Sequence, residues 1–302
     1  MPASPESTGR EFGDVVALAG ISGLVAAFDG FIIDQWGVLH DGMAPYPGAL
    51  GCLLQLRAAG KHIVVLTNSG RPEAANVRLM EKMGFPAELF DRFVCAGEDA
   101  RRAIATRATP FHARLGRRCY AFTRDGDRSL LDGTDIAFVA GVEEADFLVA
   151  IGIDSPVRSL ADYEAELAAG VARGLPMVCA NPDLFRFSPN GLIDATGVLA
   201  RRYEELGGAV FYHGKPYPAI YASCLAALGM CAPGRVIAIG DSIEHDVLGA
   251  TRAGLQSALV VGGVHAEELG AARGCLPTPE AWFAFARAAP AMPTYVVPAF
   301  AW

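Results

Sequence analysis

The stretch from Phe31 to Gly42 reads FIIDQWGVLHDG, an apolar run that ends at Asp34 and continues into a glycine-bearing turn. An apolar run of this kind, bounded by polar residues and glycine, predicts a buried β-strand. In open α/β sheets, ligands bind just beyond the carboxyl ends of the strands. Asp34 is therefore a candidate nucleophile, because a carboxylate there can form a covalent intermediate when a cation neutralises nearby charge. Taken alone, the same pattern is more often an aspartate that caps a turn.

A second apolar run ends in Thr67, Asn68 and Ser69, and Pro72 then opens the next predicted helix. The hydroxyl, amide and backbone N–H groups of such a segment can hold phosphate oxygens at the positive end of the helix. The alternative is an ordinary helix N-cap. Downstream, Lys215 stands within the sequence His213-Gly214-Lys215-Pro216, just before another proline-started helix. We expect Lys215 to neutralise phosphate and nucleophile together, although most lysines are solvated surface charges.

The apolar run from Val236 to Gly240 ends in Asp241, and a further acid, Asp246, follows five residues later. Carboxylates are the hard oxygen ligands that Mg²⁺ prefers, usually one or two of them together with water and substrate phosphate. A pair of turn-capping acids is again the alternative. Four segments with complementary chemistry in this order nevertheless predict a phosphate-processing site.

Short β-rich runs alternate with helical patterns along almost the whole chain. The predicted strands are residues 25–34, 62–67, 119–123, 146–151, 176–180, 236–240 and 257–261. The predicted helices are residues 47–59, 72–83, 98–107, 159–173, 217–228 and 245–253. Prolines open several of these helices and glycines follow them, as the termini of helices prefer. This alternation predicts an α/β fold with a mostly parallel sheet.

Composition excludes several classes of function. The chain has 302 residues and is 52% hydrophobic, but its apolar runs are shorter than the roughly 20 residues of a membrane helix, so we expect a soluble protein with no membrane partner. The formal charge of -8 opposes binding to nucleic acid. Met1 to Arg10 lack the order of a secretory signal, which favours the cytoplasm. The seven cysteines include no C-x-x-C pair and are expected to be reduced thiols, most of them buried.

Taken together, these residues resemble the haloacid dehalogenase (HAD) superfamily in a branch whose first motif reads D-x-W-G-V-L-H-D-G. Asp34 is similar to the nucleophile of motif I, Thr67 to motif II and Lys215 to motif III, while Asp241 and Asp246 are similar to motif IV. The long interval between motifs II and III resembles subclass IIA, the sugar- and nucleotide-phosphatase-like group, in which a large α/β cap is inserted there. Asn181-Pro182-Asp183 is also similar to that subclass.

The resemblance implies a doubly wound, Rossmann-like core of residues 1–88 and 188–302 with a smaller α/β cap of residues 89–187. Movement of the cap would exclude water, and substrate choice is expected to reside in the loops of the cap. The apolar C-terminal segment, residues 290–302, is expected to pack on the core. A homodimer is possible, but ordinary core packing explains the apolar residues more simply.

The resemblance also implies the roles of the site residues. Asp34, Asp241 and the backbone carbonyl of Trp36 would bind Mg²⁺, with Asp246 supporting them. Phosphate would be held by Thr67, Asn68, Ser69 and Lys215. Asp34 would attack in line to give an aspartyl-phosphate that water hydrolyses, with catalysis mainly by positioning and charge stabilisation. The expected activity is Mg²⁺-dependent hydrolysis of a small phosphorylated metabolite, such as a sugar phosphate or a nucleotide-like compound.

One position departs from the family pattern. Phosphatases of this superfamily usually carry a second aspartate two residues after the nucleophile, as the acid-base group, and this chain has Trp36 there. Indole transfers protons poorly, so a factor of roughly 10² to 10⁴ in rate is at stake unless another group substitutes. His40 and Asp41 are the nearest candidates, and their alternative is a hydrogen-bonded turn. The departure leaves two rival functions open: a phosphometabolite-binding protein with little activity, and a 2-haloacid dehalogenase-like hydrolase.

Overall fold

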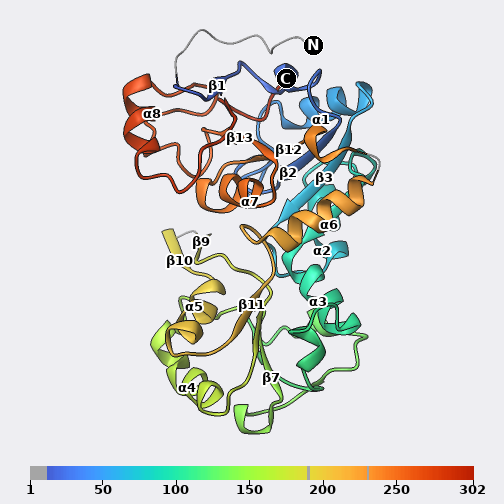
Figure 1. The fold of residues 1–302 in the computed structure, drawn as a ribbon, viewed down its shortest axis with the longest axis vertical. Coiled ribbons are helices and arrows are strands. Elements are labelled where there is room, and N and C mark those ends of the chain that lie inside the picture. Colours follow the sequence, from blue (N-terminus) through green and yellow to red (C-terminus); the bar gives the residue numbers. More distant parts are fainter. Residues whose placement is uncertain (1–11, 189–190, 230) are drawn as a thin grey trace. The chain divides into compact units, whose positions relative to one another are not determined.

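The computed structural model of the chain describes residues 12–188, 191–229 and 231–302. They form two compact units, labelled by their elements in Figure 1. The core unit comprises residues 12–67, 76–94 and 215–302, and the inserted unit comprises residues 68–75 and 95–214, in each case within the described residues. The inserted unit therefore interrupts the sequence of the core unit.

A seven-stranded sheet organises the core unit, in the order β1-β14-β13-β12-β2-β3-β4. Its strands are β1 (Val16–Ala17), β2 (Gly30–Asp34), β3 (His62–Thr67), β4 (Arg92–Cys95), β12 (Val236–Gly240), β13 (Gln256–Val260) and β14 (Tyr295–Val297). The five neighbouring pairs from β1 to β3 are parallel. Strand order reverses between β12 and β2, since β3 follows on one side of β2 and β13 lies on the other side of β12. This reversal is the position at which doubly wound sheets bind ligands.

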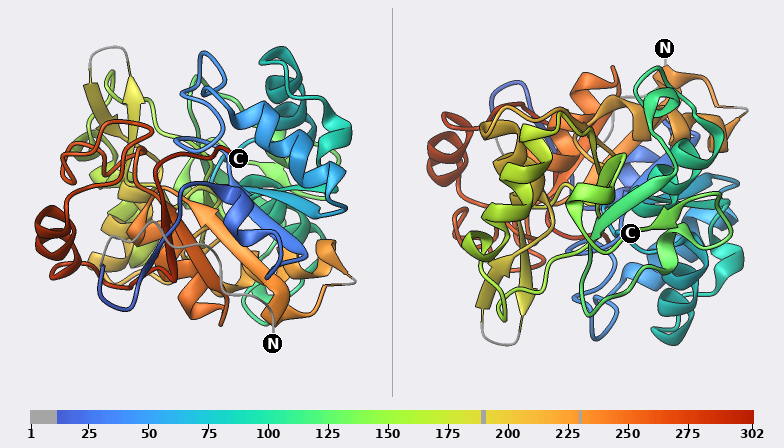
Figure 2. Two further views of the ribbon diagram at one scale, coloured as in Figure 1. Left: turned by 90° about the horizontal axis from the view of Figure 1, so that it is seen from above. Right: turned by 90° about the horizontal axis from the view of Figure 1, so that it is seen from below.

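Helices cover both faces of this sheet. They are α1 (Ala49–Ala58), α2 (Glu73–Lys82), α6 (Pro218–Leu228), α7 (Leu248–Arg252) and α8 (Pro279–Ala286), with one π-helical turn (Ile243–Val247) before α7. Figure 2 shows α1 and α2 on one face, and α6 and α7 on the other. Right-handed crossovers dictate this arrangement, because the direction of winding changes at β2. Every residue of β2 and β12 is consequently buried.

The inserted unit has its own parallel sheet of five strands, in the order β11-β8-β7-β5-β6. The strands are β5 (Arg118–Phe122), β6 (Ala137–Phe138), β7 (Phe147–Ala150), β8 (Met177–Cys179) and β11 (Val210–Tyr212). The helices are α3 (Ala96–Thr106), α4 (Glu164–Ala172) and α5 (Gly197–Glu205). An antiparallel hairpin of β9 (Phe185–Ser188) and β10 (Gly191–Asp194) lies between β8 and α5 in the sequence.

Alternate residues of the central strand β7 pack into two separate cores. Phe147 and Val149 join a cluster with Ile104 of α3, whereas Leu148 joins a cluster with Leu167 of α4. Successive side chains of a strand point to opposite faces, so a sheet covered on both sides needs an unbroken apolar run. The sequence FLVA at β7 meets this need.

The structure confirms the predicted α/β fold class, with small shifts at the ends of elements. Each predicted strand overlaps a strand of the structure, but only residues 30–34 of the run 25–34 are β, because a 3-10 helix (Ile21–Leu24) and a turn precede Gly30. The predicted boundary between cap and core at residues 187 and 188 differs from the structure. Strand β11 pairs with β8, so the inserted unit continues to Gly214.

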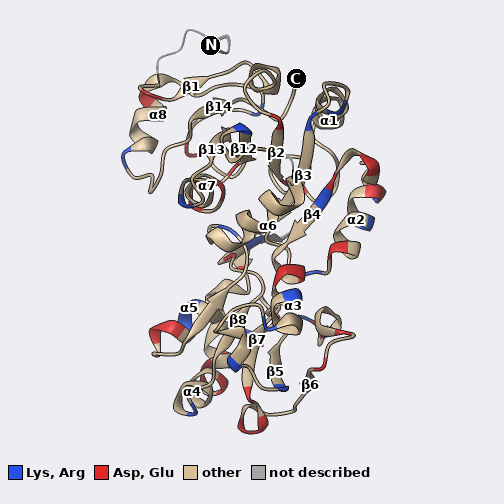
Figure 3. Cartoon of the chain, turned by 45° about the vertical axis from the view of Figure 1, so that its right-hand side comes forward, with Lys and Arg blue, Asp and Glu red and all other residues tan. Residues whose placement is uncertain are grey.

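The C-terminal segment contributes β14 to the sheet of the core unit, and Phe300 is buried. The described cysteines form no disulfide, and Cys52, Cys95, Cys119, Cys179 and Cys224 are buried. None of the described helices is long and apolar enough to cross a membrane. Figure 3 shows the positions of basic residues interspersed with those of acidic residues along the ribbon.

Candidate active site

The register of two adjacent strands brings Asp34 and Asp241 together. Ile33 of β2 pairs with Ile239 of β12, so Asp34 at the end of β2 lies beside Gly240, and Asp241 follows directly. Both aspartates are buried, each with 7% of its surface exposed. The strand order therefore places two carboxylates at the switch point of the sheet, as the sequence predicts.

Asp246 and Lys215 complete a buried cluster of charges. The π-helical turn begins after Ser242, whose side chain accepts a hydrogen bond from the His245 N–H, and it carries Asp246 back toward the strand end. Lys215 Nζ donates to Asp34 Oδ1 at 2.5 Å and to Asp246 Oδ1 at 2.7 Å. Carboxylate oxygens of Asp34, Asp241 and Asp246 all lie within 4.8 Å of one another. Three acids thus surround one lysine.

The pKa values of these groups reflect an excess of negative charge. Burial raises the pKa of Asp34 well above its usual range, although Lys215 opposes this effect. Burial, with repulsion from Asp246, raises the pKa of Asp241 to about 6. Burial disfavours the charge of Lys215, but attraction to Asp246 and Asp34 outweighs it and raises the pKa of the lysine. Lys215 is therefore a fixed positive charge, and the carboxylates around it favour further cations.

These residues fit a divalent metal ion. Mg²⁺ prefers carboxylate oxygens at a site that leaves room for water and phosphate, and three buried carboxylates with one ammonium group leave uncompensated negative charge. A bound cation would lower the pKa values of Asp34 and Asp241 by favouring their ionised forms. Asp34 and Asp241 are the side chains that we expect to hold it.

The loop after β2 is held by contacts that the sequence did not predict. Arg273 Nη2 donates to the Gly37 carbonyl at 3.1 Å, and its guanidinium group stacks on the Tyr46 ring at 3.3 Å from the centroid. Gly37 has a φ of 77°, and a Cβ atom there would lie 1.9 Å from Asp241 Oδ2. Only glycine lets the loop approach this carboxylate so closely. Because Gly37 and Arg273 lie 236 residues apart, no local pattern indicated their contact.

Thr67, Asn68 and Ser69 follow β3, the strand beside β2. Thr67 is buried at the end of β3, one residue beyond Leu66, which pairs with Asp34. Asn68 is also buried, and its Nδ2 donates to Asp183 Oδ1 at 2.7 Å within the inserted unit. The backbone N–H of Arg71 donates to Ser69 Oγ at 3.3 Å, which is an ordinary turn contact. The structure thus places Thr67 at the strand end next to Asp34, and gives Asn68 and Ser69 other partners.

The two residues considered as acid-base substitutes have structural partners. His40 is fully buried, its Nδ1 accepts a hydrogen bond from the Gly42 N–H at 2.9 Å, and burial lowers its pKa to about 4. Asp41 accepts hydrogen bonds from the Met43 and Ala44 N–H groups, which lower its pKa. Both contacts belong to the turn after β2, which favours a structural role for both residues over proton transfer.

A buried chain of polar groups in the inserted unit precedes Lys215 in the sequence. His213 Nδ1 lies 2.7 Å from Asp99 Oδ2, and His213 Nε2 lies 3.1 Å from His112 Nε2. His112 Nδ1 lies 2.7 Å from Thr109 Oγ1. Burial lowers the pKa of His112 to about 4, so its imidazole is neutral at pH 7. This chain fixes the segment that leads into Gly214, and the sequence had indicated only His213.

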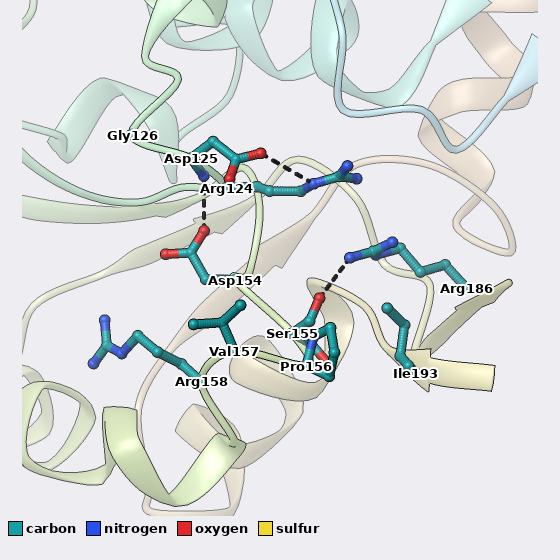
Figure 4. Close-up of a pocket in the computed structure, with 10 residues that line it drawn as sticks. All are labelled: Arg124, Asp125, Gly126, Asp154, Ser155, Pro156, Val157, Arg158, Arg186 and Ile193. Atoms are coloured by element: carbon teal, nitrogen blue, oxygen red, sulfur yellow. Dashed lines mark hydrogen bonds and ion pairs between the residues drawn. The ribbon is translucent and has the colours of Figure 1, made fainter. Parts of the chain in front are cut away.

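The inserted unit also has a pocket of about 590 Å³, drawn in Figure 4. The pocket is lined by Arg124, Asp125, Gly126, Asp154, Ser155, Pro156, Val157, Arg158, Arg186 and Ile193. Figure 4 shows the guanidinium groups of Arg124 and Arg186 pointing toward one another. Burial, together with repulsion from Arg124, lowers the pKa of Arg186. Arg124 pairs with Asp125 at 3.5 Å, whereas Arg186 donates to the Ser155 carbonyl and has no carboxylate partner among the described residues, so Arg186 can attract an anion.

Comparisons with known proteins agree with this geometry. Models of haloacid dehalogenase-like hydrolases match residues 31–137 and 113–254, and a HAD-hydrolase-like model matches residues 212–300. A ribonucleotide monophosphatase, NagD of Escherichia coli, is 30% identical over 246 residues, which cover 77% of this chain and 87% of that protein. The chain belongs to the haloacid dehalogenase-like hydrolases, and its inserted α/β unit places it in subclass IIA. The family predicted from the sequence is confirmed.

Two further proteins are similar to the chain. A dihydroxyacetone phosphatase of Corynebacterium glutamicum is 37% identical over 92 residues, 30% of this chain and 33% of that protein, so the match spans one third of that relative. A crystal structure of a haloacid dehalogenase-like hydrolase from Brucella suis has 32% sequence identity and a TM-score of 0.77. It covers 93% of this chain and 98% of its own. The fold is thus shared along nearly the whole chain.

Proposed function

We propose that this chain is a Mg²⁺-dependent phosphatase that hydrolyses small phosphorylated metabolites through an aspartyl-phosphate on Asp34. The observation that carries the proposal is the buried cluster in which Lys215 Nζ contacts both Asp34 and Asp246, while Asp241 lies within 4.8 Å of both acids. A protein that only bound phosphate would have no need of three buried carboxylates within 4.8 Å of one another. The phosphatase names of the relatives support the same activity.

Each residue has a distinct part in this proposal. Asp34 supplies the attacking oxygen, and Lys215 holds the nucleophile in position while its charge offsets that of the phosphoryl group. Asp246 orients Lys215, and it accepts a hydrogen bond from the Ser242 N–H at 3.1 Å, which fixes its own carboxylate. Thr67, with Asn68 and Ser69, is assigned to the phosphoryl oxygens. Asp34, Asp241 and the Trp36 carbonyl would hold Mg²⁺, which would supply positive charge to neutralise the phosphate.

We assign substrate choice to the arginine-lined pocket of the inserted unit. The guanidinium groups of Arg124 and Arg186 suit a carboxylate or a second phosphate, while Val157 and Ile193 offer apolar contacts. A half-buried arginine without a carboxylate partner gains a strong hydrogen-bond acceptor when an acidic ligand binds. Phosphorylated metabolites with an additional acidic group are therefore the first class of compound to examine.

The experiment is a measurement of phosphate release from a panel of phosphorylated metabolites, with and without Mg²⁺. It compares the wild type with Asp34→Asn and with a control, Asp132→Asn, which changes an exposed aspartate of the inserted unit. We expect Mg²⁺-dependent release by the wild type and the control, and none by Asp34→Asn. Substrate binding that persists in Asp34→Asn would show that only the chemical step is lost.

Three results would contradict the proposal. Release of phosphate by Asp34→Asn at the rate of the wild type would exclude Asp34 as the nucleophile. The absence of release from every compound, despite binding of Mg²⁺ and of phosphorylated ligands, would favour a binding protein instead. Release of halide from 2-haloacids without metal would favour a dehalogenase.

A further inference from the structure

The charged groups around Asp34 are already engaged in contacts that leave none of them suited to transfer a proton to a leaving group. The charged side chains with the largest effects on the pKa of Asp34 are Lys215, Asp246 and Asp241. Lys215 is paired with two carboxylates, Asp246 holds Lys215 and the Ser242 N–H, and Asp241 accepts a hydrogen bond from the Val264 N–H at 2.8 Å. These three side chains therefore hold fixed charges around Asp34 and do not act as proton donors.

His40 and Asp41, the candidate acid-base residues in the loop that follows Asp34, both make contacts within its turn. His40 has no exposed surface and its Nδ1 already accepts the Gly42 N–H, so its ring cannot reach a substrate in this structure. The Asp41 carboxylate accepts hydrogen bonds from two backbone N–H groups. Trp36 is the first residue after Asp34 in the sequence whose side chain reaches solvent, and it is 45% exposed. Its indole presents an apolar surface in place of an acid.

Cleavage of a phosphate ester without a proton donor depends on the leaving group. An alcohol would have to leave as a strongly basic alkoxide, whereas a phenol, an enol or a carboxylic acid leaves as a weakly basic anion. General acid catalysis is worth roughly 10² to 10⁴ in rate where the leaving group is basic, and little where the leaving oxygen is already stable as an anion. Trp36 therefore restricts the range of substrates.

The Trp36 indole is packed against neighbouring residues of its own loop. Its ring meets the His40 ring edge-on, with centroids 5.0 Å apart, and a Cβ atom at Gly42 would lie 2.3 Å from the indole. The His40 ring and the backbone at Gly42 thus lie against one part of the indole, while the rest of the Trp36 side chain is exposed. Flat aromatic groups pack favourably against such a surface.

We propose that the chain acts on phosphoric esters whose leaving group is a weakly basic oxyanion, above all aromatic or otherwise flat, and that Trp36 packs against this group. The inference rests on the proposed phosphatase function and narrows its substrate class. A bond forms between Asp34 Oδ and phosphorus as the bond to the leaving oxygen breaks. The leaving group departs with the electron pair and takes a proton from bulk water. Water then attacks phosphorus, the bond to Asp34 breaks, and the proton of the water passes to phosphate or solvent.

The test is a series of aryl phosphates in which the pKa of the leaving phenol rises by about four units, assayed with saturating Mg²⁺. For the wild type we expect kcat/KM to fall by about 10²- to 10³-fold along the series, because nothing protonates the more basic phenols. Trp36→Asp adds a carboxyl group and is expected to flatten this dependence, with a gain of about 10²-fold for the most basic phenol. Trp36→Phe, the matched control, keeps an apolar ring and is expected to keep the steep dependence.

The outcomes separate this inference from the proposed function. Hydrolysis by the wild type that varies less than about tenfold along the series would show that a proton donor operates, and would overturn the inference while the phosphatase function stands. A dependence that stays steep in Trp36→Asp, in a variant that still binds Mg²⁺, would overturn the part assigned to Trp36. Failure to hydrolyse even the ester of the most acidic phenol would overturn both the inference and the proposed function.

Discussion

The site of the core unit and the pocket of the inserted unit hold their charged groups in opposite ways. The side chains of Lys215, Asp34 and Asp246 are each less than 10% exposed, and Lys215 contacts both acids directly. The side chains of Arg124 and Asp125 in the pocket are 52% and 86% exposed. Burial makes the geometry of the first group rigid and strengthens its electrostatic interactions, whereas the second group can adapt to different ligands. We therefore propose that the buried cluster of the core unit carries out the chemistry and that the pocket of the inserted unit recognises the substrate.

The largest difference between the two regions should follow from Lys215→Met. The substitution leaves Asp34 and Asp246 buried without their cation, which we expect to lower the free energy of unfolding of the metal-free protein by about 3–5 kcal/mol. Arg186→Met in the pocket should change it by less than about 0.5 kcal/mol, as substitutions away from buried networks usually do. Urea denaturation of the three proteins measures both effects. Equal stabilities of the two variants would contradict the comparison.

Asp241→Asn should have the opposite effect on stability. The raised pKa of Asp241 means that its ionised form is disfavoured in the fold, so a neutral amide at this position should raise the thermal midpoint of the metal-free protein by about 2–4 °C. The same substitution should remove the stabilisation that Mg²⁺ gives the wild type. Thermal melts of the wild type and the variant, with and without Mg²⁺, measure both effects. A lower midpoint in the metal-free variant would show that the carboxylate stabilises the fold.

The raised pKa of Asp241 also sets a pH dependence. A group whose pKa rises from 3.8 to about 6 on folding contributes stability that is fully present below 3.8 and is lost as the pH rises through 6. Mg²⁺ binding requires the ionised carboxylate, so the affinity for Mg²⁺ should increase by about tenfold per pH unit up to pH 6 and level off above it. Calorimetric titrations across this range measure the affinity. An affinity that does not change between pH 5 and about pH 7 would count against the assignment of Asp241 as a ligand.

The smallest effect is expected from Arg186→Met on kinetics. Loss of one charge-assisted hydrogen bond in the pocket should raise KM by about 5- to 10-fold for substrates with a second acidic group, with little change in kcat. Arg117→Met, which changes a 76% exposed arginine of the inserted unit outside the pocket, is the control. A fall in kcat with unchanged KM would assign Arg186 to the chemical step instead.

The sequence predicted the site best where a buried strand ends in a charged residue. The runs before Asp34 and Asp241 have the apolar length and the polar ending that predict a strand and its functional end, and the structure places both aspartates side by side. The assignment of Lys215 depended on the resemblance to a family, because one lysine before a proline carries no local signal of burial. Its contacts with Asp34 and Asp246 join residues far apart in the sequence.

Other features could not be read from local patterns. The short strands β1, β11 and β14 have two or three residues each, and they are stabilised by pairing with distant strands. Helices α5 and α8 were not predicted. Arg273 and Asp99 have no sequence signal, because each acts through a contact with a segment more than 100 residues away. Tertiary contacts of this kind decide the extent of the inserted unit and the support of the site.

The central claim is that Asp34 becomes phosphorylated during turnover. Mixing the protein with a substrate and Mg²⁺, quenching with acid within the first turnover and mapping the peptides by mass spectrometry would detect the intermediate. We predict one phosphoryl group on the peptide that contains Asp34, lost on treatment with hydroxylamine and missing from Asp34→Asn. Phosphate release without any phosphorylated peptide, or a phosphoryl group on another residue, would contradict the account.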